Sequence, residues 1–154
     1  MANETLKSSL DPACIRLELN ASTRDGAISE LIDLIHAKHH LKNPEEALRV
    51  VMEREQKMST SLENGIAVPH GKADSIDHLL VAVGLKKKGI DFKSADGQRS
   101  NIIILILSST ARVGPHMRCL AEIGRLLQSD ANRKKVLAAK DAETVYEIMS
   151  CTEM

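Results

Sequence analysis

Aromatic side chains are almost absent from this chain of 154 residues, which contains no tryptophan, one phenylalanine (Phe92) and one tyrosine (Tyr146). Proteins that stack nucleobases need aromatic rings, so this composition argues against that kind of site. The chain also lacks an excess of charge, because 21 basic residues balance 21 acidic residues. Nucleic acids and anionic membranes attract proteins with a basic surplus. We therefore expect no nucleic-acid partner and a core built from aliphatic side chains.

Long apolar runs and cysteine motifs are missing as well. The polar segment from Met1 to Leu10 lacks the apolar region of a secretory signal, and no stretch approaches the roughly 20 apolar residues that span a bilayer. This predicts a cytoplasmic protein without direct membrane insertion. Cys14, Cys119 and Cys151 are odd in number and form no C-x-x-C pair, which favours buried thiols over disulfides or structural zinc. The glycine motifs that bind nucleotide phosphates are also absent, so no cofactor is expected.

Apolar patterns along the chain predict alternating strands and helices, and hence an α/β fold. A mobile tail over about residues 1–12 precedes a strand at 15–19, and the apolar runs at 79–85 and 101–107 are typical of strands covered on both faces. Capping and apolar spacing predict helices that start near Ser22, Pro44 and Pro115, followed by two more over about 131–138 and 142–149. Asn43 and Asp141 are predicted to cap the second and the last of these helices, and the basic stretch 86–89 is predicted to form a turn. The length is that of a single domain, 1–154.

The stretch of residues 64–72, Asn-Gly-Ile-Ala-Val-Pro-His-Gly-Lys, reads as a site. Pro69 cannot donate to a strand ladder and ends the apolar run, so His70 is expected to lie exposed at the end of a strand. Gly71 leaves room for a close backbone or a bulky anion, and Lys72 adds a positive charge. A surface histidine in an ordinary turn is the simpler alternative.

Two further residues have the chemistry to join His70. His116 stands at the start of a helix, where unpaired N–H groups and the helix dipole favour an anion, although it could merely cap that helix. Arg54 continues the apolar line of its helix, or pairs with Glu53 or Glu55 at the surface. If the three converge, they combine a nucleophilic imidazole, a second imidazole and a guanidinium that matches phosphate. That combination suits a phosphoryl acceptor.

Metal binding is the competing chemistry. One candidate group is a helical set at i, i+3 and i+4 spacing, namely His36, His39 and His40. The other is a possible metal-hydrolase set, namely His70, His116 and Cys119. No carboxylate motif accompanies either group, so we expect no metal.

The pair Arg54-Glu55, the stretch 64–72, and His116 followed by Leu120 resemble the enzyme IIA domain of the fructose-mannitol family of the bacterial phosphoenolpyruvate-dependent phosphotransferase system (PTS). The likeness runs from about Leu17 to Met149 and includes the nitrogen-regulatory branch. It implies an α/β sandwich with a mixed central sheet flanked by helices. It also implies that His70 accepts a phosphoryl group from the carrier HPr or an HPr-like protein, that His116 orients or stabilises it, and that Arg54 binds the phosphate.

Two functions remain open under this resemblance. In the first, phosphorylation controls association with regulated target proteins. In the second, the protein passes phosphate to an enzyme IIB domain during sugar uptake. We expect the regulatory role, because no IIB or membrane domain is fused to the chain. Glu63 stands where family members often have glycine, which predicts charge repulsion or an altered turn near the phosphate.

Overall fold

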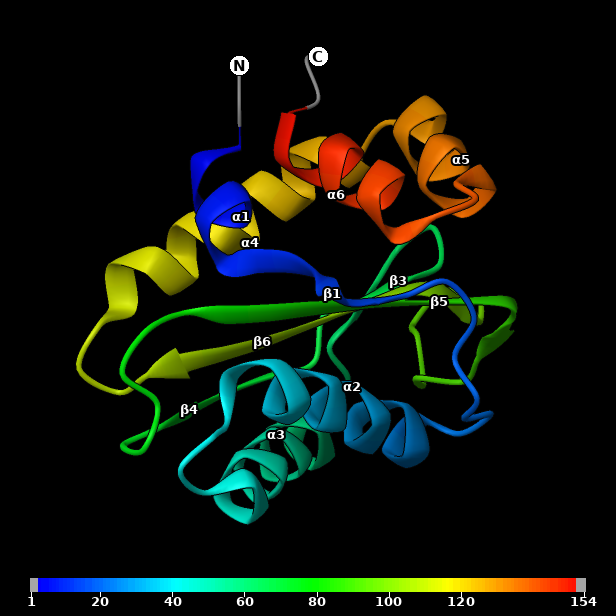
Figure 1. The fold of residues 1–154 in the computed structure, drawn as a ribbon. Coiled ribbons are helices and arrows are strands. Elements are labelled where there is room, and N and C mark those ends of the chain that lie inside the picture. The colour runs from blue at the N-terminus through cyan, green and yellow to red at the C-terminus, as the bar shows by residue number, and fades with distance from the viewer. Residues whose placement is uncertain (1–2, 152–154) are drawn as a thin grey trace.

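The computed structural model describes residues 3–151, with Cys151 described in its backbone only. It is a mixed α/β fold in which helices flank a central sheet (Figure 1), as predicted. The elements in chain order are α1 (Glu4–Ser9), β1 (Leu10–Arg16), α2 (Arg24–His39), α3 (Pro44–Lys57), β2 (Ser61–Leu62), β3 (Ile66–Ala67), β4 (His70–Ala73), β5 (Leu80–Ile90), β6 (Ser100–Ser109), α4 (Val113–Leu127), α5 (Asp130–Ala138) and α6 (Ala142–Cys151).

The sheet has the strand order β1-β5-β6-β3-β2, and β4 also pairs with β6. Strand β5 is antiparallel to β6, whereas β1 runs parallel to β5, and β3 and β4 run parallel to β6. Ile66 pairs with Ile102 and His70 with Ile106, so β3 and β4 are successive parts of one path along β6. The path is interrupted between them, immediately before the candidate histidine.

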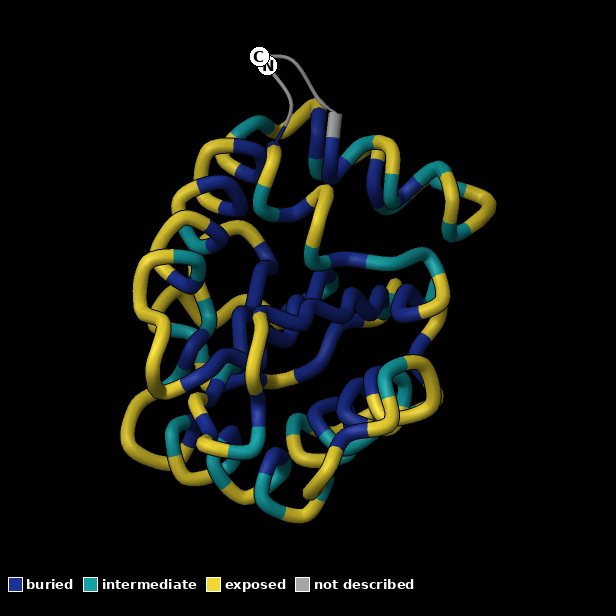
Figure 2. Tube along the Cα trace, turned by 60° about the vertical axis from the view of Figure 1, so that its left-hand side comes forward, coloured by how far each residue is buried: buried dark blue, intermediate teal, exposed yellow. Residues whose placement is uncertain are grey.

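Helices cover both faces of the sheet. Figure 1 shows α2 and α3 below the sheet and α1, α4, α5 and α6 above it. Alternate residues of β6 face the two sides: Ile103 and Leu105 pack with α2 and α3, while Ile104 and Ile106 pack with the other helices. The buried chain in the middle of Figure 2 is therefore apolar on both faces. This arrangement explains the continuous apolar runs in the sequence.

The N-terminal segment differs from the prediction. Residues 3–12 do not form a mobile tail, because they contain α1 and the start of β1. Leu6 is fully buried, and the buried carboxylate of Glu122 in α4 accepts hydrogen bonds from the Leu6 and Thr5 backbone nitrogens at 2.9 and 3.1 Å. One apolar side chain and one buried acid thus anchor a segment that is otherwise polar.

Several element boundaries also shift. The cap of α2 is Thr23 rather than Ser22, β1 ends at Arg16, and the expected turn at residues 86–89 instead continues β5. The caps Asn43 and Asp141 are confirmed, because each accepts a hydrogen bond from a backbone nitrogen of its helix.

Two further expectations bear on the whole chain. Cys14 and Cys119 are buried free thiols, as expected, whereas the Cys151 side chain lies outside the described residues. Within residues 3–151, every helix is too short or too polar to cross a membrane.

Candidate active site

His70 is the first residue of β4, and the chain enters it through a break in the sheet. Pro69 has no N–H group, and its carbonyl accepts a hydrogen bond from Ile106 N at 3.0 Å. The preceding residue bonds to a different part of the sheet: Val68 N donates at 3.1 Å to the carbonyl of Thr60, which directly precedes β2, and not to β6. His70 is consequently half-buried at the start of a strand rather than exposed at the end of one. The sequence prediction of its position was wrong in this respect.

The His70 ring has a defined tautomer. Its Nδ1 lies 2.9 Å from the carbonyl oxygen of Val68. A carbonyl oxygen can only accept, so Nδ1 carries the hydrogen and Nε2 keeps the lone pair. Burial lowers the pKa of His70, and the Arg54 and Lys72 cations lower it further against the opposing effects of the Val68 bond and Glu55. At neutral pH the ring is therefore neutral, with Nε2 as a potential nucleophile.

His116 meets this ring from the first turn of α4. The two ring centroids are 5.1 Å apart, with the planes inclined at 62°. His116 is buried, and its Nδ1 lies 3.0 Å from the hydroxyl of Ser108, at the end of β6. Burial, followed by the charges of His70 and Lys72, lowers the pKa of His116 to about 4. The predicted convergence of the two histidines is thus present, and both rings are neutral near pH 7.

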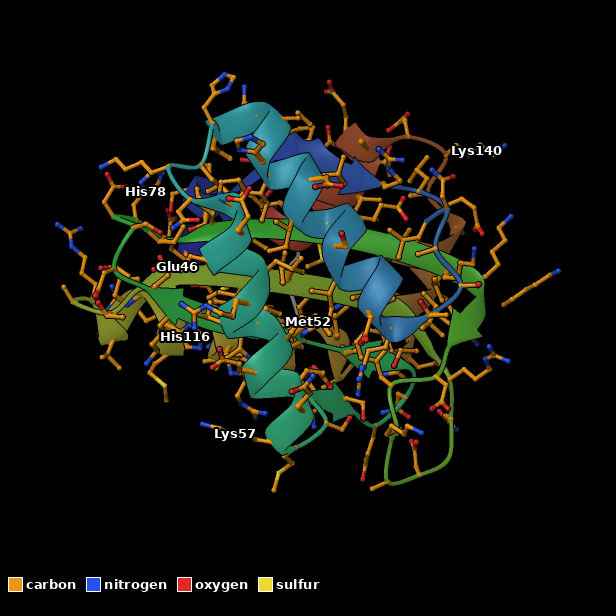
Figure 3. The ribbon with its side chains drawn as sticks, turned by 90° about the horizontal axis from the view of Figure 1, so that it is seen from below. Glu46, Met52, Lys57, His78, His116 and Lys140 are labelled. Atoms are coloured by element: carbon orange, nitrogen blue, oxygen red, sulfur yellow. The ribbon has the colours of Figure 1, made fainter. Side chains whose placement is uncertain are left out.

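Arg54 reaches the site because α3 packs directly on β4. A Cβ atom on Gly71 would lie 2.7 Å from Val50 Cγ2 and 3.0 Å from Val51 N, so only glycine permits this approach. Arg54, one turn beyond Val50, is close enough for its charge to lower the pKa of His70. Its Nη1 donates to Met58 O at 2.7 Å. Figure 3 shows α2 and α3 lying across this face of the sheet, with Lys57 at the far end of α3 from Glu46.

The simpler alternative for Arg54 was a surface pair with a neighbouring acid. In the structure, Glu53 pairs with Arg49 at 2.8 Å, and the Glu55 carboxylate accepts two hydrogen bonds from Thr60. Arg54 forms no ion pair with either of them among the described residues. Its guanidinium uses one of its five donors on a carbonyl and has others for an anion.

Three residues of the site were not identified from the sequence. Ser108 is a buried polar residue that directly follows the apolar run of β6, and its position could have suggested a partner for a buried ring. Glu55 is buried four residues after Val51, on the apolar line of α3, which is an unusual place for an acid. Lys72 was noted only as a nearby charge, yet it acts on both histidines.

Glu63 does not lie beside the histidines. It belongs to the turn between β2 and β3, where Gly65 O accepts hydrogen bonds from Asn101 N and Ile102 N at 2.8 and 3.1 Å. His70 pairs with Ile106, five residues further along β6, which is roughly 17 Å along a strand. The expected charge repulsion near the phosphate is therefore wrong, and the acid that acts on His70 is Glu55.

The metal alternatives gain no geometric support. Among residues 3–151, no three side chains of His, Cys, Asp or Glu are grouped to hold a metal ion. Burial, with a contribution from Glu122, raises the pKa of Cys119 to about 12, so this thiol stays protonated and is a poor ligand.

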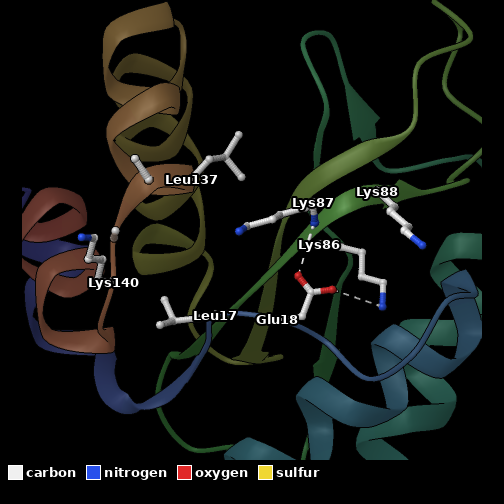
Figure 4. A pocket seen from close by; sticks show the side chains of 9 residues that line it. Leu17, Glu18, Lys86, Lys87, Lys88, Leu137 and Lys140 are labelled. Atoms are coloured by element: carbon white, nitrogen blue, oxygen red, sulfur yellow. Dashed lines mark hydrogen bonds and ion pairs between the residues drawn. The ribbon is translucent and has the colours of Figure 1, made fainter.

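A separate groove lies away from the histidines, beside residues 86–88 in the second half of β5. It has a volume of about 730 Å³ and is lined by Leu17, Glu18, Lys86, Lys87, Lys88, Leu137, Ala138, Ala139 and Lys140. Figure 4 shows the Glu18 carboxylate contacting Lys86 and the Lys87 backbone, so part of the positive charge of the groove is neutralised. The opposite end of β5 pairs with the β6 residues next to His70, so the groove is no part of the histidine site.

Comparison with known proteins shows the family of this chain. Residues 8–151 match the family described as "Phosphoenolpyruvate-dependent sugar phosphotransferase system, EIIA 2". The chain belongs to this EIIA family. It is 31% identical over 136 residues to a PTS system fructose-specific EIIA component of Haloferax volcanii, covering 88% of each chain. It is 29% identical over 139 residues to a nitrogen regulatory protein of Bradyrhizobium diazoefficiens, covering 90% of each.

Coverage is not equal for every relative. A PTS system fructose-specific EIIABC component of Bacillus subtilis is 26% identical over 88% of this EIIA chain but only 21% of its own length. Among solved structures, the nitrogen regulatory protein IIA-Ntr of Neisseria meningitidis has a TM-score of 0.87 at 20% identity, covering 94% of this chain and 99% of that one. The complex of enzyme IIA-mannitol with phosphorylated enzyme IIB-mannitol of Escherichia coli contains a match with a TM-score of 0.78 at 20% identity, covering 92% and 96%. These similarities establish the shared fold.

Proposed function

We propose that this EIIA protein is a phosphocarrier that holds a phosphoryl group on Nε2 of His70, taken from phospho-HPr or an HPr-like carrier. The observation that carries the proposal is the 2.9 Å contact between His70 Nδ1 and Val68 O. It leaves Nε2 as the only ring nitrogen with a free lone pair, beside the second histidine. A neutral imidazole is a competent nucleophile near neutral pH.

The transfer step needs no general base, because the attacking nitrogen of His70 carries no proton. The Nε2 lone pair attacks phosphorus, the bond from phosphorus to the donor side chain breaks, and the donor keeps that electron pair. His70 becomes a phosphoimidazolium, because Nδ1 keeps its proton and its bond to Val68 O. When a second protein accepts the phosphoryl group, the ring leaves as the same neutral tautomer. No metal or nucleotide takes part in these steps.

The neighbouring residues stabilise the phosphoryl group. Arg54 and Lys72 supply positive charge to its equatorial oxygens, where most of the catalytic effect in phosphoryl transfer arises. The Ser108 hydroxyl can donate to or accept from His116 Nδ1. We assign it as the donor, since that tautomer places an N–H group on Nε2 of His116 that can donate a neutral hydrogen bond to phosphate. A cationic His116 is disfavoured by the low pKa of about 4.

We further propose that the chain is a single EIIA domain, acts in the cytoplasm and serves a regulatory role through target proteins. The nitrogen regulatory relative, which this chain covers over 90% of its length, supports the regulatory role. The second candidate is a sugar-uptake component that passes phosphate to an enzyme IIB domain. The 31% identity to a fructose-specific EIIA component and the mannitol IIA–IIB complex favour it.

Incubation with phosphoenolpyruvate, enzyme I and HPr, followed by intact mass measurement, tests the carrier role. We expect an acid-labile phosphoryl gain that is lost in His70→Ala and retained in His78→Ala, a control at an exposed histidine. A wild-type protein that stays unmodified beside active donors would contradict the proposal. Adding an enzyme IIB domain then separates the two roles, because rapid loss of the phosphoryl group to IIB identifies the sugar-uptake component.

A further inference from the structure

The buried acid Glu55 has no part in the transfer step above. It lies in the last turns of α3 with 2% of its surface exposed, and no cation of residues 3–151 forms an ion pair with it. Its two carboxylate oxygens instead accept hydrogen bonds from Thr60, from the backbone nitrogen at 3.0 Å and from the hydroxyl at 2.5 Å. Burying a carboxylate is costly unless strong hydrogen bonds compensate, so both bonds hold Thr60 firmly.

The hydrogen bonds continue from Thr60 to the histidine ring. Thr60 O accepts from Val68 N at 3.1 Å, and Val68 O accepts from His70 Nδ1 at 2.9 Å. Every link joins donor to acceptor without a gap. Pro69 has no N–H group, so the strand ladder is interrupted here. The Val68 backbone nitrogen donates to the Thr60 carbonyl. The orientation of the Val68 carbonyl thus depends on where Thr60 is held.

From this chain of bonds we infer that Glu55 is a positioning residue for His70. Acting through Thr60 and Val68, it holds the carbonyl that keeps the proton on Nδ1 and leaves Nε2 free to attack. The inference rests on the proposed role of His70 as phosphoryl acceptor, but the tautomer itself can be measured without any phosphorylation.

The Glu55 charge has a second effect on the same ring. The groups that act on His70 are Arg54 and Glu55 from α3, Lys72 from β4 and His116 from α4. Among them Glu55 is the only acid, and its charge favours a positive ring. The ring becomes positive when Nε2 takes the phosphoryl group, so Glu55 stabilises the phosphorylated form as well as the tautomer.

Two substitutions separate geometry from charge. In Glu55→Ala the chain of bonds ends at Thr60, so we expect ¹⁵N NMR of His70 to change from a single Nδ1–H tautomer to a mixture. We expect phosphorylation to slow about tenfold or more, because misplacing a reacting group by about 1 Å costs up to about a hundredfold. In Glu55→Gln the side chain keeps its shape, so the tautomer should persist while phosphorylation slows about fivefold.

The matched control is Glu53→Ala, which removes an exposed acid from the same helix, paired only with Arg49. It should change neither the tautomer nor the rate. If Glu55→Ala does not fold, Thr60→Val takes its place, since it removes the 2.5 Å hydroxyl bond and keeps the backbone bond. Tautomer signals like those of the wild type in a folded Glu55→Ala or Thr60→Val protein would overturn the inference. A wild type that shows the Nδ1–H tautomer but gains no phosphoryl group beside active donors would instead contradict only the carrier role.

Discussion

The contact between Gly71 and α3 gives a quantitative test of how the site is assembled. In Gly71→Ala the added methyl would lie 2.7 Å from Val50 Cγ2, 3.0 Å from Val51 N and 3.1 Å from Val50 C. The first atom belongs to a side chain that can rotate, but the other two belong to the helix backbone. Helix α3 must therefore move away from β4. Overpacking of this kind costs about 1–3 kcal/mol, and we expect the upper half of that range because backbone atoms are involved.

Urea denaturation of Gly71→Ala and phosphorylation kinetics measure the two consequences separately. The free energy of unfolding should fall by about 2–3 kcal/mol. Phosphorylation should slow as well, because α3 carries Arg54 away from His70. The control is Gly124→Ala in α4, where a Cβ atom would meet nothing within 4 Å. That change should stabilise the protein by about 0.5–1 kcal/mol, since alanine is the better helix former.

A second substitution tests the cause of the Gly71→Ala effect. Adding Val50→Ala removes Cγ2 and should recover part of the lost stability, while the clash with the Val51 nitrogen persists. Full recovery would mean that the side chain alone made the clash. Gly71→Ala stability equal to that of the wild type would refute the proposed packing of α3 on β4.

Three other changes test other parts of the structure. Arg54→Ala should slow phosphorylation with little effect on the urea midpoint; an unchanged rate would remove Arg54 from the site. Leu6→Ala should cost about 2–5 kcal/mol in urea denaturation, because the residue is fully buried, whereas a mobile tail would show no loss. The pKa of His116 is about 4 in the native protein and about 6.5 in the unfolded chain. Between these two pH values the unfolded chain therefore binds a proton at His116 and the native protein does not. From pH 7 to pH 5 the free energy of unfolding should thus fall about 2 kcal/mol more than in His116→Asn, and equal slopes would disprove this assignment.

The sequence was most informative where one local pattern decides the structure. Apolar runs located β5 and β6, and the caps Asn43 and Asp141 located two helices. The stretch with Pro69 and His70 indicated a site because proline interrupts a strand for a local reason, the missing N–H group. The family resemblance supplied the mixed character of the sheet, which no local pattern contains.

The sequence was least informative where distant residues fix the structure. The tail prediction failed because Leu6 is held by Glu122, which is 116 residues away along the chain. Glu63 was misplaced because distance along the chain was taken for distance in space: β3 carries it away from the histidines. Glu55 was read as a possible surface partner of Arg54 and as part of the family pair Arg54-Glu55, without a role of its own, since nothing in the sequence shows that Thr60 folds back to cover it.

The charges around His70 explain why one site can both accept and release a phosphoryl group. Before transfer, Arg54 and Lys72 outnumber Glu55 by one positive charge, and this surplus helps to keep both histidine rings neutral. Transfer adds a dianionic phosphoryl group and makes the ring positive, a net change of one negative charge that cancels the surplus. A site without Glu55 would bind the phosphate oxygens more tightly but would stabilise the positive ring less. We therefore expect Glu55→Gln to slow the loss of the phosphoryl group to water or to an acceptor less than it slows uptake, because removing the acid weakens the positive ring but strengthens the hold on phosphate. Single-turnover uptake and release rates of the wild type and Glu55→Gln measure that difference, and equal slowing of both steps would show that Glu55 acts through geometry alone.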